Sequence, residues 1–84
     1  MNEQTKRVVN QWMDSLSDDI KQNALRLIAN GEAERNSAGA YPAWLIDLAD
    51  KFEEYVQATG KCIDEAYLPS EIIDRFITRL VGWG

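Results

Sequence analysis

Apolar side chains recur at the spacing of an α-helix in four separate stretches of the chain. Within each stretch they gather on one face of a helix, and polar side chains take the opposite face. No stretch alternates apolar and polar residues as a strand would. The four apolar faces are, in chain order, Val8, Val9, Trp12, Met13 and Leu16; Ile20, Ala24, Leu27 and Ile28; Tyr41, Trp44, Leu45, Leu48, Phe52, Tyr55 and Val56; and Ile72, Ile73, Phe76, Ile77 and Leu80.

Helix-capping residues separate the first two of these predicted helices. Ser15 and Ser17 have side chains that accept hydrogen bonds from the free amides at a helix start. Asp18 and Asp19 then place negative charge in the first turn, where the helix dipole favours it. The second helix should end at Gly31, because glycine adopts the left-handed conformation that commonly closes a helix.

Proline and glycine mark the ends of the other two predicted helices. Pro42 and Pro69 are suited to the first turn, where the missing amide hydrogen is not needed. Gly60 and Gly82 are predicted to end the third and fourth helices. Residues 32–41 carry no apolar periodicity, so we expect a loop before the third helix.

A short additional helical turn is predicted near residues 61–67, where Cys62, Ile63, Ala66 and Tyr67 offer a small apolar face. Each amphipathic helix needs a surface against which to bury its apolar face, so the helices should pack around one shared core. The prediction is therefore an all-α fold: a small four-helix bundle with this short extra turn, in a single domain spanning residues 1–84.

The composition agrees with a folded domain and limits its partners. Apolar residues make up 45% of the chain and charged residues 27%, which is the range of globular proteins. Fourteen acidic residues against nine basic ones give a net charge of −5. That charge slows approach to phosphate backbones and favours a partner with a positive surface, although it also serves ordinary solubility.

Three features bear on where the protein resides. The longest apolar run, residues 43–46, is too short to cross a membrane. No apolar segment of signal-peptide length follows the N-terminus. The single cysteine, Cys62, has no partner for an internal disulfide. We therefore expect a cytoplasmic protein.

The chain contains no histidine, which removes the Ser-His-Asp and Cys-His arrangements and the usual proton shuttle near neutral pH. Lys61 could lower the pKa of the Cys62 thiol and make it reactive, but a lone cysteine is more often inert packing. We expect no enzyme activity, no catalytic residues, no cofactor and no metal site.

Acidic side chains on the third helix form the first candidate for partner binding. Asp47, Asp50 and Glu54 fall on one face opposite the core, and Glu53 lies beside them. Such a row is often only a solvated helix surface, and it could also hold a divalent cation weakly. It could instead dock on a protein with a basic surface. Acidic inhibitors of the phage or mobile-element type, which imitate nucleic acid, use this mechanism.

Two apolar residues form the second candidate. Ile46 lies off the core stripe of its helix, and Trp83 stands beyond Gly82 near the end of the chain. Single exposed apolar residues are normal, but tryptophan is enriched among the residues that anchor interfaces. Trp83 is therefore a candidate for contact with a partner or with a second copy.

Arg75 and Arg79, one turn apart on the last helix, form a candidate nucleic-acid contact that Glu71 and Asp74 partly neutralise. Two phosphate contacts are few beside the six to ten of a committed binder. The leading hypothesis is a non-enzymatic interaction module: a small regulator, adaptor or inhibitor that docks on a protein through a helical face. The alternatives are a self-assembling homodimeric structural protein and a weak nucleic-acid binder.

Overall fold

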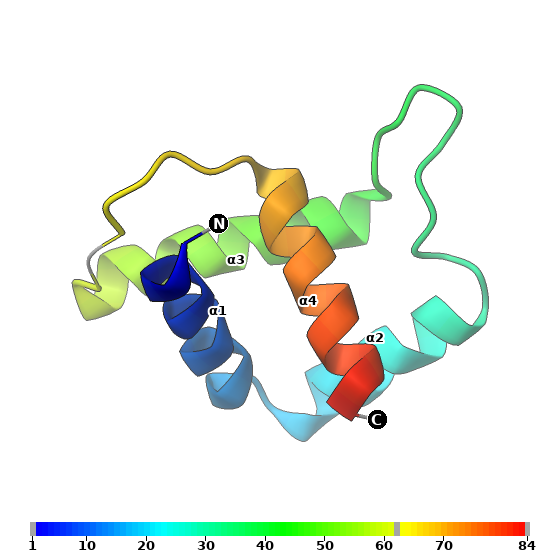
Figure 1. Ribbon diagram of the computed structural model, residues 1–84. Coiled ribbons are helices and arrows are strands. Elements are labelled where there is room, and N and C mark those ends of the chain that lie inside the picture. Colours follow the sequence, from blue (N-terminus) through cyan, green and yellow to red (C-terminus); the bar gives the residue numbers. More distant parts are fainter. Residues whose placement is uncertain (1, 62, 84) are drawn as a thin grey trace.

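The computed structural model describes residues 2–61 and 63–83, apart from the side chain of Trp83. Its regular structure consists of four α-helices (Figure 1): α1 Glu3–Ser15, α2 Asp18–Ala29, α3 Ala43–Thr59 and α4 Pro69–Trp83. The described residues contain no strand. The predicted all-α fold with four helices is confirmed.

The predicted helix boundaries are mostly confirmed. Ser17 caps α2, since its hydroxyl accepts a hydrogen bond from the Ile20 amide at 3.3 Å. Gly60 closes α3 in the left-handed conformation, with a φ of 66°. Pro42 precedes the first residue of α3, and Pro69 is the first residue of α4. Each of these residues therefore acts at the end where its backbone preference is useful.

The prediction that Gly82 ends the last helix is wrong. The helix α4 continues through Gly82 to Trp83, and the backbone of Gly82 is not left-handed. Glycine inside a helix costs only about 1 kcal/mol relative to alanine, so it ends a helix only when the chain has a reason to turn. The preceding turn is fixed by Leu80, which is buried in the core.

The predicted extra helical turn near residues 61–67 is also wrong in its described part. Residues 63–68 form an irregular segment, here called the strap, that connects α3 to α4. Pro69 disfavours helical backbone at the residue before it, so a helical turn could not run directly into α4. Cys62 lies outside the described residues.

The strap is tied to the start of α1 rather than folded on itself. The backbone amide of Asn2 donates to Glu65 Oε1 at 2.7 Å, and Asn2 Nδ2 donates to Asp64 Oδ1 at 3.0 Å. Asn2 also caps α1, because its Oδ1 accepts from the Thr5 amide at 2.8 Å. These carboxylates bond to a distant residue, so they do not support a local helical turn.

The core is built around Trp12 of α1. Its indole lies edge-on to Phe52, with ring centroids 5.3 Å apart, and tilted against Phe76 at 5.8 Å. Aromatic pairs in these orientations add to the stabilisation from burial. The buried apolar residues are Val8, Val9, Trp12, Met13, Ala24, Leu45, Leu48, Ala49, Phe52, Ile72, Ile73, Phe76 and Leu80.

The helix α4 lies at the centre of the fold, with α3 crossing behind its first turns, α1 at its side and α2 passing behind its C-terminal end (Figure 1). The other three helices all pack against α4, and α3 does so most extensively. Among the described residues, the backbone of α2 closely approaches α4 but neither α1 nor α3. The sides of α2 and α3 that face each other are therefore not closed by backbone packing.

Residues 30–42 form the predicted loop, which projects from the bundle (Figure 1). Asn36 organises its tip, since Oδ1 accepts hydrogen bonds from the amides of Ala38 at 2.9 Å and Ala40 at 3.0 Å. Gly39 completes the turn with a φ of 81°. The turn at the tip is thus stabilised by hydrogen bonds within the loop.

The base of the loop is anchored to α4. The hydroxyl of Tyr41 donates to Asp74, and the Arg35 guanidinium lies over the Tyr41 ring, 4.7 Å from its centroid. Arg35 also pairs with Asp74 at 3.5 Å. Burial, and then the hydrogen bond to Asp74, raise the pKa of Tyr41. These contacts fix the entry of the chain into α3.

Candidate functional site

The carboxylates of the protein divide into those that bond within the fold and those that have no partner among the described residues. Glu3, Asp14, Glu53, Asp64, Glu65, Glu71 and Asp74 make a hydrogen bond or an ion pair. The rest are Asp18, Asp19, Glu32, Glu34, Asp47, Asp50 and Glu54. The last three stand together on one helix.

These three carboxylates, Asp47, Asp50 and Glu54, form what we call the acidic row of α3. All are exposed, and they follow one another at a spacing of one helical turn. Seven residues separate the ends of the row, which corresponds to about 10 Å along the helix. Lys51 is the only base within the span of the row. The structure therefore brings together three of the four acids that the sequence predicts.

The fourth predicted acid, Glu53, has a different role. It points about 100° away from Glu54 around the helix. Its carboxylate accepts a hydrogen bond from the Tyr67 hydroxyl, whose ring lies edge-on to Phe52 at 5.7 Å. Burial, followed by this contact with Glu53, raises the pKa of Tyr67. Glu53 therefore holds the strap against α3.

Of the two predicted apolar contacts, the structure describes the side chain of only Ile46. Ile46 is 44% exposed and lies one turn before Asp50 on α3, at the edge of the acidic row that is away from Asp47 and outside the lining of any described groove. It stands as a single exposed apolar side chain, which is normal for a soluble surface. The side chain of Trp83 lies outside the described residues.

An open groove runs between α2 and α3 on the other side of the acidic row. It has a volume of about 230 Å³, and one member of the row, Asp47, lines it. We call it the α2–α3 groove. Its lining residues are Ile20, Asn23, Ala24 and Leu27 from α2 and Trp44, Asp47, Leu48 and Lys51 from α3. The groove exists because α2 and α3 both pack against α4 rather than against each other.

The aromatic wall of the groove is held in place. The indole Nε1 of Trp44 donates to the backbone carbonyl of Glu32 at 2.7 Å, which satisfies the polar end of the side chain. The residue is half-buried and lines the groove, so part of its surface remains open to solvent. A tryptophan fixed in this way presents a rigid apolar surface at little cost in side-chain entropy.

The sequence does not reveal this groove, because its apolar residues follow the same helical spacing as the core. Ile20, Leu27 and Trp44 are all on the apolar faces predicted to be buried, yet each is only half-buried. A stripe at helical spacing identifies a face that prefers burial. It does not say whether another helix of the chain covers that face.

No protein-family model, no curated protein and no solved structure matches this chain. No group of three or more metal-ligating side chains in the described residues could hold a metal ion. None of the helices, over the same residues, is both long and apolar enough to cross a membrane. The groove and the acidic row are therefore the features from which a function can be argued.

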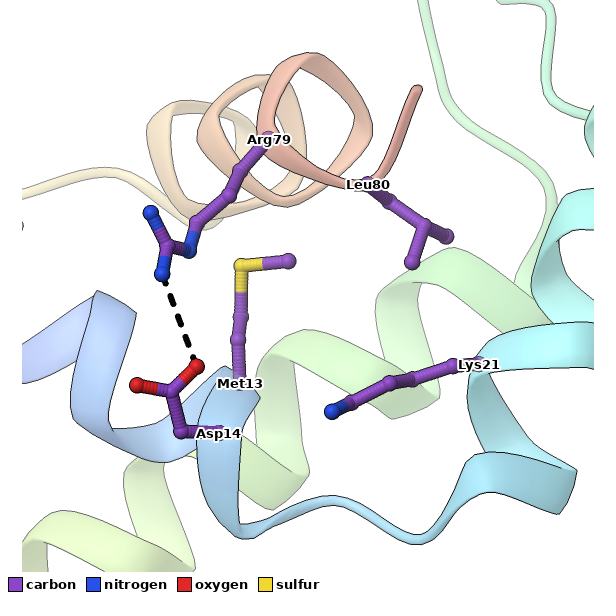
Figure 2. A pocket seen from close by; sticks show the side chains of 5 residues that line it. All are labelled: Met13, Asp14, Lys21, Arg79 and Leu80. Carbon is purple, nitrogen blue, oxygen red and sulfur yellow. Dashed lines mark hydrogen bonds and ion pairs between the residues drawn. The ribbon is translucent and has the colours of Figure 1, made fainter. Parts of the chain in front are cut away.

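Arg75 and Arg79, the candidate nucleic-acid contacts, face α1. The Nη2 atom of Arg75 donates to Asn10 Oδ1, and Nη2 of Arg79 donates to Asp14 Oδ1, both at 3.5 Å (Figure 2 shows the second contact). A phosphate that bound these arginines would compete with both contacts. The pair therefore belongs to the seam between α1 and α4.

Beside this seam lies the small cavity of Figure 2, whose volume is about 20 Å³. The side chains of Met13 and Leu80 form its apolar part, and Lys21 extends into the same space from α2. A cavity of this size holds little more than one water molecule. It is a packing gap between three helices, not a ligand site.

A polar cleft of about 270 Å³ also opens between α1 and α4, lined by Lys6, Glu71, Asp74, Arg75 and Thr78. Its two acids and two bases balance in charge, and each already has a hydrogen-bond or ion-pair partner within the fold. This cleft has no uncompensated charge to offer a ligand. The α2–α3 groove with its acidic border is the better candidate.

Proposed function

We propose that this protein is a non-enzymatic interaction module, a small regulator, adaptor or inhibitor that docks on a partner protein through the outer face of α2 and α3. The observation that carries the proposal is that an apolar groove and a row of unpaired carboxylates adjoin and share Asp47. Interfaces combine an apolar centre with a polar rim, and this face offers both.

The charge on this face favours a partner with a basic surface. The acidic row carries three carboxylates against one base, Lys51, within a protein of net charge −5. Charges without a partner inside the fold are available to attract opposite charge over about 8 Å, the Debye length at physiological salt. An acidic mimic of nucleic acid is one form of this proposal, in which the carboxylates occupy phosphate positions in a basic cleft.

The groove supplies what the charges alone do not. Exposed ion pairs each contribute about 0–1 kcal/mol, so a row of three gives steering and selectivity more than affinity. Apolar side chains buried against Trp44, Leu27 and Leu48 would supply the main attractive free energy. A partner that uses both features would bind at a rate that depends on salt and with an affinity that depends on the groove.

Affinity capture with a matched charge control tests the proposal. The test variant is Asp47→Asn, Asp50→Asn and Glu54→Gln, which removes three charges from α3 with little change in shape. The control variant is Glu3→Gln, Asp14→Asn and Glu34→Gln, which removes the same charge elsewhere on the exposed surface. Each bait is incubated with extract of the source cells, and captured proteins are identified by mass spectrometry.

The expected result is a partner that wild type and control recover equally and that the α3 variant recovers at least tenfold less. The partner is then purified, and its affinity is measured by calorimetry at two salt concentrations. Equal recovery with all three baits would contradict the proposal. Light scattering on the protein alone tests the homodimer alternative, since a stable dimer at micromolar concentration would favour self-assembly over docking.

A further inference from the structure

We infer that the α2–α3 groove receives an amphipathic helix of the partner, with apolar anchors on one stripe and lysine or arginine along one flank. This inference rests on the proposed function and names the chemistry of the partner. It starts from the walls of the groove, which are themselves two helices. Residues 20–27 of α2 and 44–51 of α3 each supply about 10 Å of wall, or two helical turns.

The apolar part of the groove suits helical anchors. Ile20 and Leu27 contribute from one wall, Trp44 and Leu48 from the other, and Ala24 leaves room between them because its side chain is small. An amphipathic helix that enters a groove places side chains at i, i+3 or i+4, and i+7, which spans two turns. The length of the walls matches that repeat.

The two rims of the groove differ in charge, and this sets the flank. The α3 rim carries Asp47 and, farther out, Asp50 and Glu54, against the single base Lys51. On the α2 rim, Asn23 is neutral and accepts a hydrogen bond from the Arg26 guanidinium. Among the lining residues, the one carboxylate, Asp47, lies on the α3 side together with Lys51, and the α2 side of the lining carries no charge. Beyond the lining, Asp50 and Glu54 extend the negative charge along the outer face of α3. Basic residues belong on the side toward α3.

The probe is a synthetic 14-residue helical peptide with leucine at i, i+4 and i+7 and lysine along one flank. A second peptide replaces each lysine with glutamate, and a third replaces each leucine with serine. Binding to the isotope-labelled protein is followed by amide chemical shifts in NMR spectra and by the change in tryptophan fluorescence. The lysine peptide should shift the resonances of Leu27, Trp44 and Leu48 and should bind at least tenfold more tightly than either of the others.

Two protein variants locate the contact. Leu27→Lys places a charge in the groove at a half-buried position, and Val81→Lys makes the same change at a position on α4 that is 54% exposed and outside the groove. The first should weaken the lysine peptide at least tenfold, and the second should leave its affinity unchanged. Thermal unfolding of both variants checks that the fold is retained.

A charge reversal separates the groove from general electrostatic attraction. Asp47→Lys with Asp50→Lys should make the protein prefer the glutamate peptide, with the same resonances shifted. If peptides bind without shifting Leu27 and Trp44, or if Leu27→Lys has no effect, the helix inference is overturned while capture by the acidic row can still stand. If Leu27→Lys instead abolishes self-association of the protein alone, a second copy occupies the groove, and the inference is likewise overturned.

Discussion

Asp14 of α1 and Arg79 of α4 face each other across the seam between two helices, with 3.5 Å between Oδ1 and Nη2. Asn10 and Arg75 repeat this contact one turn earlier, with the same separation of 65 positions in the sequence. A constant separation means that α1 and α4 run in the same direction and in register. The two arginines therefore specify how the helices align, which explains why they are not available as a pair for phosphate.

The ion pair between Asp14 and Arg79 should contribute little to stability. The two side chains are 70% and 38% exposed, so water and salt screen the attraction. We expect a double-mutant cycle with Asp14→Asn and Arg79→Gln to give a coupling of about 0.2–1 kcal/mol that shrinks at high salt. The free energies come from urea unfolding followed by circular dichroism. Zero coupling at low salt would contradict a role for this pair in the alignment.

The positions of the helices in the chain could be predicted from the sequence, but which helices pack against each other could not. Trp12, Phe52 and Phe76, each from the predicted apolar face of a different helix, are buried as expected. The apolar faces of α2 and α3 obey the same spacing, yet Leu27 and Trp44 remain half-exposed. Periodicity is a property of one helix taken alone. The groove between α2 and α3 arises because both helices pack against α4 and not against each other.

The acidic row of α3 could be predicted from the sequence, but the separate role of Glu53 could not. Helical geometry alone places Asp47, Asp50 and Glu54 in one row, and the structure leaves them exposed and unpaired. Whether Glu53 joins them depends on Tyr67, which is fourteen positions away and reaches it across the strap. Contacts of this kind depend on the path of the chain, which no local pattern contains.

Replacing Gly60 and Gly82 with alanine should change the free energy of unfolding in opposite directions. Gly60 has a φ of 66°, where an L side chain is strained, so Gly60→Ala should lower the free energy of unfolding by about 1 kcal/mol. Gly82 is the last residue but one of α4 and has helical backbone, so Gly82→Ala should raise it by at most about 0.5–1 kcal/mol, the value for a helix interior. An added Cβ meets nothing within 4 Å at either position, so only the backbone distinguishes them. Urea unfolding of both variants gives the signs, and a stabilising Gly60→Ala would contradict the left-handed helix end.

The contact between Tyr67 and Glu53 should make the protein less stable in alkali. Burial and then Glu53 raise the pKa of Tyr67 above its ordinary value of 10.0, so the phenol ionises less readily in the folded chain than in the unfolded one. The folded state therefore holds more protons between the two pKa values. This contribution is fully present below pH 10 and is lost as the pH rises above it. Urea unfolding at a series of pH values should show a steeper loss in wild type than in Tyr67→Phe.

Tyr41→Phe is the comparison variant for that measurement. The pKa of Tyr41 is also raised, first by burial and then by Asp74, so this tyrosine makes its own contribution of the same sign. The double variant should show the shallowest alkaline loss, with each single variant between it and wild type. If Tyr67→Phe loses stability as steeply as wild type does, the strap is not held by the protonated phenol.

At acid pH we expect the opposite dependence of stability on pH, and it comes from Glu65 in the strap. The Thr5 hydroxyl and then the Asn2 amide lower the pKa of Glu65 below its ordinary value of 4.5. Thr5 Oγ1 has no partner at hydrogen-bonding geometry among the described residues, yet it lies near enough to favour the charged carboxylate. Between the two pKa values the unfolded chain binds more protons, so this contribution is present above pH 4.5 and is lost as the pH falls.

Glu65→Gln tests this contact, because glutamine can still accept from the Asn2 amide but does not titrate. We expect its unfolding free energy to depend less on pH below 4.5 than that of wild type. Asn2→Ala removes both the strap contact and the cap of α1, and should cost about 1 kcal/mol at neutral pH from the lost cap alone. The two variants are compared by urea unfolding between acid and neutral pH. If Glu65→Gln keeps the full acid dependence, the charge of Glu65 does not contribute to holding the strap on α1, which leaves the contact of Asn2 with Asp64.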